Sequence, residues 1–353
     1  MLNQIKLESV DAKCKNCGNN LRYSPEVHKL KCEKCGSTKE IEATYLNEKK
    51  PYDNLDDSEL DDWQKLEKVI KCKSCGSTIE LKNNEISINC PYCDSQNIVL
   101  QDEIKGLYPD NIVLFRFGKE VASQKFKEQV KKKFMAPRAF KKQIPENSID
   151  GFYFPSFGFD ADSYSTYKGR LYEHYTTTVN GKTTTHTRYF SIKGEVDCAH
   201  RDVVVESSSR LTQYELKNML PYDFKLKSDF KPEYLFGYKV EQYNERFSVS
   251  ATKGKELCDE QIRTKILSKY HYDGVDYLNV DSTYKNKKFA YYMLPVYTFS
   301  FMFKNKNYTA FMNGQTGKLG SGLPISKLKV ALGIIGFILL IIMIVLLAGV
   351  AGD

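Results

Sequence analysis

Eight of the ten cysteines in this 353-residue chain form four Cys-x-x-Cys pairs near the N-terminus. The second two pairs repeat the first two at a constant offset, so that Cys14 corresponds to Cys72 and Cys35 corresponds to Cys93. About 14 residues between the two pairs of a quartet suit an out-and-back hairpin that returns the second pair to the first, so each quartet is predicted to be a zinc ribbon. The predicted ligands are Cys14, Cys17, Cys32 and Cys35 in the first ribbon and Cys72, Cys75, Cys90 and Cys93 in the second.

Glycine follows the first pair of each quartet, at Gly18 and Gly76, where such a turn often needs a positive φ. The alternating run 85–89 is predicted to be the return strand into Cys90. Four thiolates complete the tetrahedron of Zn²⁺, so two structural zinc ions are expected, with no open position for catalysis. Redox chemistry is less well supported, because a redox Cys-x-x-Cys uses one pair at a helix start. Disulfides are also less well supported, since a long cysteine-poor region follows the regular pairs.

The zinc sites change the charge of the chain. The formal net charge is +8. Eight thiolates and two divalent ions lower it to roughly +4, which weakens a global electrostatic argument for nucleic acid. Between the ribbons lies an acidic run that is expected to be a solvated linker, with docking of a basic partner as the alternative. Its acidic residues are Asp53, Asp56, Asp57, Glu59, Asp61 and Asp62.

A chain of 353 residues is long enough for two or three compact folded units rather than one. The predicted fold is two small zinc-ribbon β modules, an α+β, β-rich middle domain and one C-terminal transmembrane helix. The predicted bounds are 10–42 for the first ribbon, 43–66 for the acidic linker, 67–101 for the second ribbon, 105–326 for the middle domain and 330–350 for the transmembrane helix.

The middle domain contains two predicted helices. A strand is predicted over 112–117, followed by a helix from Gly118 whose apolar residues recur every four positions. A second helix is predicted over Gly254–Tyr270 with the same stripe, in which Cys258 corresponds to Ala122. The stripe residues are Ala122, Phe126, Val130 and Phe134 in the first helix, and Cys258, Ile262, Ile266 and Tyr270 in the second.

A similar apolar strand follows each helix, over 152–159 and 291–299. Each strand contains a proline, Pro155 or Pro295, which is expected only at a sheet edge or a strand start. The repeated order of helix and strand predicts two related halves, that is, an internal duplication.

Three turns are predicted in the same region. Asn180-Gly181 indicates a type I′ turn in a Thr-rich hairpin over 175–186, which is expected to project from the body. A second hairpin is predicted from 299–303 and 308–312 with its turn at 304–307, and a further turn over 313–317.

No pattern in the chain indicates a reaction centre, and an enzyme is not expected. The Asn180-Gly181 register places His174 and His186 on opposite faces, which argues against a shared metal. Cys198 and His200 lie two residues apart on one strand face, too far for direct proton transfer, and Cys198 is expected to be a small buried residue. Cys258 takes the same interpretation on its helix stripe. The lysines of the first helix and beyond could touch nucleic acid or anionic lipid, or simply be solvated; they are Lys125, Lys127, Lys131, Lys132, Lys141 and Lys142.

The run Val330–Val350 contains no charged residue over 21 positions. At 1.5 Å per residue it is ~31 Å long, which matches the hydrocarbon core of a bilayer. Lys327 and Lys329 precede it and only three residues follow, so the positive-inside rule predicts a tail-anchored, single-pass protein of the cell membrane whose N-terminal region lies in the cytoplasm. Thiols that ligate zinc need the same reducing side.

Several stretches together resemble a family of bacterial membrane proteins with transcription-factor-B-type zinc ribbons, some of which carry a misleading primosomal or helicase-like label. The matching stretches are the Cys-x-x-Cys-Gly ribbons, 113–117, 136–137, 151–161, 294–297, 312–318 and 323–326. The resemblance implies an integral membrane protein without established catalysis. It also suggests recruitment of cytosolic envelope-stress or band-seven-type scaffold proteins.

Two functions follow as hypotheses. The first is a membrane-anchored, cytosol-facing adaptor that binds protein partners at the inner face of the bilayer through its ribbons, edge strands or Thr-rich hairpin. The alternative is a membrane-tethered nucleic-acid binder in which Lys15, Lys34 and Lys73 contact phosphates. A thiol enzyme using Cys198 and His200 is a weaker third hypothesis.

Overall fold

The computed structural model describes residues 13–42, 48–52, 107, 109–142, 144, 148–241 and 243–350, with backbone alone for 345–350 and for four short strands between 68 and 98. Its strands are β1 (Leu21–Ser24), β2 (Lys29–Cys32), β3 (Thr38–Lys39), β4 (Lys50–Pro51), β5 (Lys68–Lys71), β6 (Thr78–Leu81), β7 (Glu85–Asn89), β8 (Gln96–Ile98), β9 (Asn111–Val113), β10 (Ser148–Val179), β11 (Lys182–Glu206), β12 (Lys227–Asp229), β13 (Lys239–Glu241), β14 (Gly274–Phe303) and β15 (Lys306–Asn313). Its helices are α2 (Lys119–Lys132), α3 (Arg138–Lys142), α4 (Gln213–Met219), η2 (Phe224–Leu226), η3 (Pro232–Leu235), α5 (Phe247–Leu267) and α6 (Lys327–Val350).

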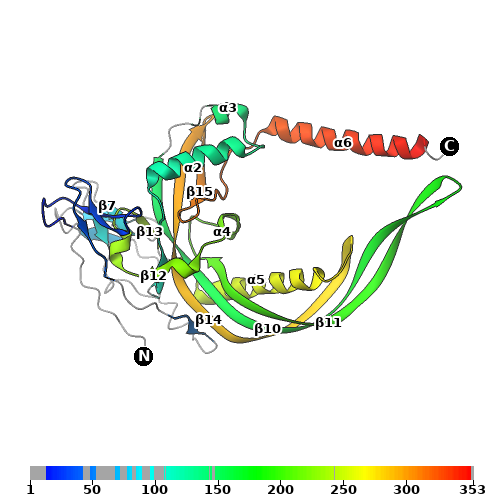
Figure 1. Ribbon diagram of the computed structural model, residues 1–353, viewed down its shortest axis with the longest axis horizontal. Coiled ribbons are helices and arrows are strands. Elements are labelled where there is room, and N and C mark those ends of the chain that lie inside the picture. The colour runs from blue at the N-terminus through cyan, green and yellow to red at the C-terminus, as the bar shows by residue number, and fades with distance from the viewer. Residues whose placement is uncertain are drawn as a thin grey trace.

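Two long antiparallel strands, β10 and β14, form the centre of the main sheet (Figure 1). Within the described residues the sheet runs β12-β9-β14-β10-β13-β7-β8, with β11 added to β10 and with β15 and β4 added to β14. The predicted β-rich character with a C-terminal apolar helix is confirmed.

The two faces of β14 are buried under different elements, as the period of a strand requires. Tyr291, Met293 and Tyr297 belong to one core together with residues of α2 and α5. The intervening residues, such as Tyr292 and Leu294, belong to a second core under α4. The sheet is therefore sandwiched between helices, which is why its central part is apolar on both faces.

The predicted helices exist, with different ends. Ala122, Phe126 and Val130 are buried as expected, but Phe134 lies beyond the end of α2 and is 73% exposed. The helix stops because Lys133 is extended, which turns the chain out of the helical path. α5 begins at Phe247, before the predicted start at Gly254, because Phe247 itself packs into the core.

The predicted strand 112–117 is wrong beyond Val113. β9 pairs in parallel with β14 through Asn111 and Ile112 alone. Further along, Phe115 stacks on Tyr238 with ring centroids 4.2 Å apart. The apolar run continues because its side chains enter the core, although the backbone no longer pairs as a strand.

The pairing of β10 is repeated by β14. β10 pairs in parallel with β13 at Tyr153, and β14 pairs in parallel with β9 at the corresponding Met293. Further along, β10 pairs with β11 and β14 pairs with β15, both antiparallel. Phe154 lies opposite Leu294, so this pair occupies the centre of the repeat.

Hydrogen bonds outside the strands follow the same repeat. Ser207 N–H donates to the carbonyl oxygen of Pro155 at 3.2 Å, and Gly314 N–H donates to that of Pro295 at 2.8 Å. The helices follow it less closely, because Ala122 lies in the first turn of α2 whereas Cys258, its predicted counterpart, lies in the middle of the longer α5. The strand geometry recurs, and descent from a duplication stays a prediction.

Pro155 and Pro295 lie inside the two central strands, so their predicted place at an edge or strand start is wrong. Each lies where its strand changes partner. Pro155 follows the last pair with β13, at Tyr153, and precedes the first pair with β11, at Ser156. A proline is tolerated there because the gap between two partner strands needs no N–H.

Beyond the core, β10, β11 and β14 continue as a long curved arm (Figure 1), made of residues 162–179, 182–200 and 274–285. Asn180 and Gly181 both have positive φ and join β10 to β11, which confirms the predicted type I′ turn and its register. The tip is exposed on both faces, so the predicted projection is confirmed. The second predicted hairpin is also present, with a shorter turn at Lys304-Asn305.

Two β-bulges at one level bend the sheet where the arm begins. Between Phe159 and Asp162, both β11 and β14 contain one more residue than β10. The bulged strands have residues with positive φ, Asp202 and Asn286. Bulges bend and twist a strand, and two bulges at the same level bend all three strands of the arm together. Asp162 accepts hydrogen bonds from Asn286 and Arg201, and these bonds lower its pKa.

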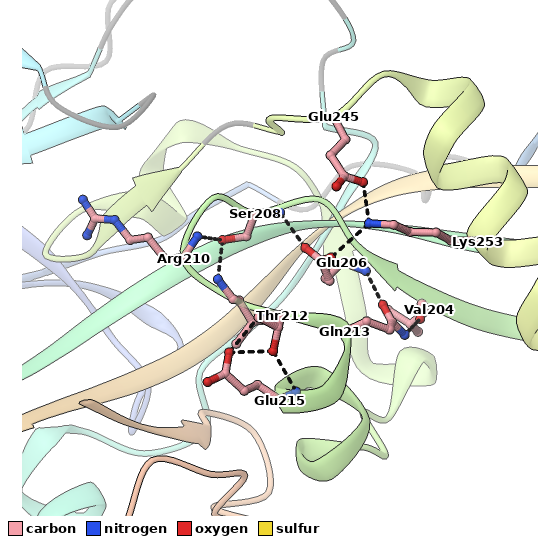
Figure 2. Close-up of polar contacts among 10 residues, drawn as sticks. Val204, Glu206, Ser208, Arg210, Thr212, Gln213, Glu215, Glu245 and Lys253 are labelled. Carbon is pink, nitrogen blue, oxygen red and sulfur yellow. Dashed lines mark hydrogen bonds and ion pairs between the residues drawn. The ribbon is translucent and has the colours of Figure 1, made fainter. Parts of the chain in front are cut away.

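The start of α5 is tied to the end of β11 (Figure 2). Lys253 of α5 lies between Glu206 and Glu245, with nitrogen–oxygen distances of 3.3 and 2.6 Å. Burial raises the pKa of Glu206. The loop that follows Glu206 leads into α4, and there Thr212 and Glu215 form the capping box that begins this helix.

Candidate metal site

The first cysteine quartet lies on two matching loops joined by the β1–β2 hairpin. In each loop the N–H of the first cysteine donates to a carbonyl oxygen at the far end of the loop, at 2.7 Å from Cys14 and 2.8 Å from Cys32. The glycine of each loop donates back to that cysteine, at 2.8 Å from Gly18 and 2.9 Å from Gly36. Both glycines have positive φ, 72° and 76°, which confirms the expectation for Gly18. The two loops therefore present their sulfurs in the same way.

The four sulfurs meet at one point. Cys14 Sγ lies 3.5 Å from Cys35 Sγ, and Cys17 Sγ lies 3.5 Å from Cys32 Sγ. All four sulfurs lie within 4.8 Å of one another. A zinc ion with Zn–S bonds of ~2.3 Å would hold its tetrahedral sulfurs ~3.8 Å apart. The predicted ligands of the first ribbon are therefore together, and they could hold one metal ion.

Hydrogen bonds favour the thiolate form at two of the four sulfurs, those of Cys14 and Cys35. The Ser37 hydroxyl lies 3.0 Å from Cys35 Sγ, and this contact, with a further bond from the Ser37 backbone, lowers the pKa of Cys35 to about 6. A hydrogen bond from the backbone of Asn16 lowers the pKa of Cys14. At Cys17 a hydrogen bond from the Asn19 backbone lowers the pKa, but burial and the contacts with the other three cysteines outweigh it and raise the pKa to about 11. The thiolate is the form that binds metal, so the loops favour the ligating state at Cys14 and Cys35 but not at Cys17.

The ribbon is packed onto the body of the protein through Tyr23 of β1. Its N–H donates to the Phe236 carbonyl oxygen at 2.9 Å, and its ring lies edge-on to Tyr234 with centroids 5.4 Å apart. Tyr23 is 4% exposed, and Cys14 and Cys32 belong to the same hydrophobic core as the body. No local pattern pointed to this docking, because its partners lie far along the chain.

The second quartet, Cys72, Cys75, Cys90 and Cys93, lies outside the described residues, as do Lys73, Gly76 and the acidic run 53–62. The predicted return strand is present as β7, over Glu85–Asn89. β7 pairs with β8 and, on its other side, with β13 of the middle domain. This backbone pairing makes β7 and β8 part of the main sheet.

The other candidate residues do not form a second site in the described part of the chain. His174 Nδ1 lies 3.1 Å from the Thr187 hydroxyl, and His186 Nε2 lies 2.7 Å from the Thr177 hydroxyl, so each has its own partner. Cys258 is buried on α5, as expected. Cys198 is half-buried rather than buried, because it packs at the margin of the small core between α5 and the arm.

His200 belongs to a polar chain that sequence reasoning missed. Its Nε2 lies 2.9 Å from the Ser163 hydroxyl, and its Nδ1 lies 2.7 Å from Gln261 Oε1. The order of groups resembles a nucleophile, a base and an orienting residue. His200 is 1% exposed and Ser163 is 4% exposed, so a substrate could not reach them in this conformation. No signal in the sequence pairs these three residues, which come from two strands and a helix.

At the other end of the body, α6 extends away from the sheet (Figure 1). Its segment Lys327–Ile344 is long and apolar enough to cross a membrane, and none of it is buried against the rest of the protein. The predicted span over 330–350 lies within α6, which begins three residues earlier, at Lys327.

The chain is similar to a Bacillus subtilis (strain 168) protein described as uncharacterized protein YdjG. The two are 31% identical over 324 residues, which cover 91% of this chain and 92% of the relative. No family model matches the chain. No solved structure matches it either.

Proposed function

The chain belongs to the family of YdjG, and from its cysteine cluster and its unpartnered apolar helix we propose that it is a membrane-anchored adaptor. Its zinc ribbons and arm would bind cytosolic protein partners at the inner face of the membrane. The resemblance to membrane proteins with transcription-factor-B-type ribbons points to envelope-stress or band-seven-type scaffold proteins as partners.

The closed set of four sulfurs carries the proposal. Four thiolates at tetrahedral distances suit Zn²⁺, and they leave no position for a substrate. Such a site stabilises a small module, whose exposed surface is then available to a partner. By the repeat in the sequence, Cys72, Cys75, Cys90 and Cys93 would hold a second zinc ion in the same way.

The helix α6 supplies the anchor. An apolar helix that packs on nothing in the described chain is costly in water and stable in a bilayer. Lys327 and Lys329 lie at its start, and positive residues flank membrane spans on the cytosolic side. This orientation places the thiols in the reducing compartment that zinc ligation needs.

Cross-linking in intact cells tests the adaptor. We expect the full-length chain, solubilised gently from membranes, to recover specific cytosolic proteins, and a Cys14→Ser chain to recover less of them. Cys198→Ala is the matched control, because Cys198 lies outside the metal site. Recovery of no cytosolic protein by the wild-type chain would contradict the proposal.

Nucleic-acid binding is the alternative, and the charge of the first ribbon gives it less support. Residues 13–42 contain seven Lys and Arg and four Glu. With a zinc site of charge −2 the net charge is about +1, which is small for phosphate recognition. Two of the cations are already paired, Arg22 with Glu33 and Lys29 with Glu40. A steep fall of nucleic-acid affinity with salt would favour this alternative.

A further inference from the structure

Two segments that are far apart in the sequence meet where α6 leaves the body. Ser326 N–H donates to the Met135 carbonyl oxygen at 2.9 Å. The Lys329 ammonium donates to the carbonyl oxygens of Phe134 and Ala136 at 2.6 and 2.9 Å. The loop between α2 and α3 is therefore tied to the first turn of the apolar helix, and Figure 1 shows these three helices together.

Both segments are rich in positive charge. Residues 131–142 and 325–329 contain eight cations and no acidic residue. Among the residues that the structure describes, none of the eight is paired with a carboxylate. The eight are Lys131, Lys132, Lys133, Arg138, Lys141, Lys142, Lys327 and Lys329.

Large apolar side chains point outward beside these cations. Phe134 is 73% exposed and Met135 is 47% exposed, while Ile325 and Leu328 are 66% and 69% exposed. We call the eight cations and these four residues the basal patch.

The apolar residues of the basal patch are held outward by the fold. Ala136 is 2% exposed, and Phe140 is fully buried with its ring 5.0 Å from that of Phe301. The loop is thus anchored on both sides of its exposed residues. Lys141 further fastens α3 to α2 by donating to the Lys131 carbonyl oxygen at 2.9 Å. The Phe134 ring itself lies outside the core, with the Lys329 ammonium 5.1 Å from its centroid.

We propose that the basal patch binds the headgroups of anionic membrane lipids, with Phe134 and Met135 inserted between them. The proposal rests on the membrane anchor of the preceding subsection, because α6 brings the patch to the bilayer surface. Exposed aromatic and apolar residues ringed by Lys and Arg are the pattern of interfacial binding. The patch would set the orientation of the body, since it fastens one side of the base to the membrane.

The test uses the full-length chain reconstituted in vesicles. Its single tryptophan, Trp63, is removed by Trp63→Phe, and Phe134→Trp places a probe in the patch. Vesicles contain phosphatidylcholine alone or with roughly a quarter of phosphatidylglycerol. In separate preparations of the mixed vesicles, only one of the two lipids has brominated chains, which quench a nearby indole. We expect blue-shifted emission and stronger quenching by the brominated phosphatidylglycerol.

Charge variants in the same background test the cations. Lys131→Gln/Lys132→Gln/Lys133→Gln should lower the preference for phosphatidylglycerol at least about five-fold, which is the loss of affinity expected when a single lysine is removed near an anionic membrane surface. The matched control is a triple change of exposed lysines on the arm, Lys168→Gln/Lys193→Gln/Lys285→Gln, which should leave the preference unchanged.

Extraction with alkaline carbonate separates the two proposals. If the chain resists extraction while the probe stays in water, or is quenched equally by both lipids, the anchor stands and the lipid site is overturned. If carbonate extracts the chain while anionic vesicles still quench the probe selectively, the anchor fails and the basal patch stands. An extracted chain without selective quenching overturns both.

Discussion

Ser37 and Gly36 shape the surroundings of one cysteine, Cys35, in the candidate metal site. Gly36 closes its loop with a positive φ, and the Ser37 hydroxyl lies 3.0 Å from Cys35 Sγ. These contacts are local, so they can form as soon as the loop does. The meeting of both loops requires the β1–β2 hairpin, and an ion would then lock it.

Replacement of one ligand tests the site at this scale. A Cys14→Ser chain should contain one zinc equivalent less than the wild-type chain, because three thiolates and a hydroxyl bind the ion much more weakly. Metal analysis of the purified chain measures this. Cys198→Ala should bind as much zinc as the wild type, and equal zinc in the Cys14→Ser chain would show that these sulfurs are not ligands.

Among the elements, α5 and the arm depend on each other. Ile262 and Ile266 of the helix are buried against Tyr167, Leu171 and residues of β11. A three-stranded arm without a helix packed on it would bury few apolar side chains, and isolated hairpins are only marginally stable in water. The helix therefore stabilises the proximal half of the arm, while the tip beyond it is exposed on both faces.

An Ile262→Ala change should loosen the arm. The expected loss of stability is about 2–5 kcal/mol, because Ile262 is fully buried and the helix can close only part of the cavity. Hydrogen exchange should increase for the arm amides of residues 162–171. The exposed neighbour Glu256→Ala serves as the control, and unchanged exchange in the Ile262→Ala chain would refute the dependence.

The arm tip offers a separate test of docking. Replacing residues 176–185 with Asn-Gly places the turn next to Tyr175 and His186, a pair of the same hydrogen-bonded type as the pair that flanks the native turn, and removes only exposed residues. Thermal unfolding of the body should therefore change little. If the tip is a docking element, the cross-linked partners of the shortened chain should decrease. A large fall in the unfolding temperature would show instead that the tip is structural.

Across the whole molecule, the first ribbon and α6 lie at opposite ends of the body (Figure 1). Each is attached to the body at its own place. The ribbon packs on the η3 region through Tyr23, and α6 is tied to the α2–α3 loop through Lys329. A membrane anchor at one end would leave the ribbon at the other, where a partner could reach it.

Truncation after Lys329, which keeps the bonds of this side chain to the α2–α3 loop, tests this arrangement. The shortened chain should move from the membrane fraction to the soluble fraction while its body unfolds at the same temperature, because no part of Lys327–Ile344 is buried on the body. Fractionation and thermal unfolding measure the two effects. Fusion of an unrelated apolar span of equal length should restore membrane attachment, and a truncated chain that stays in the membrane fraction would refute the anchor.

The sequence by itself determined the features that depend on neighbours along the chain. The cysteine spacing identified the four sulfurs that meet, Asn180-Gly181 determined the register of the arm, and the apolar run predicted α6. Turn geometry and side-chain period are local properties, so they can be inferred without knowledge of the fold.

Only the tertiary structure decided what depends on partners far along the chain. It placed Pro155 and Pro295 inside central strands, bent the arm with two bulges, and brought His200 to Ser163 and Gln261. It also packed the ribbon onto the body and left Phe134 exposed beside Lys329. The reason is physical: which strands pair, and which apolar side chains find a core, is determined by contacts between residues that are distant in the sequence.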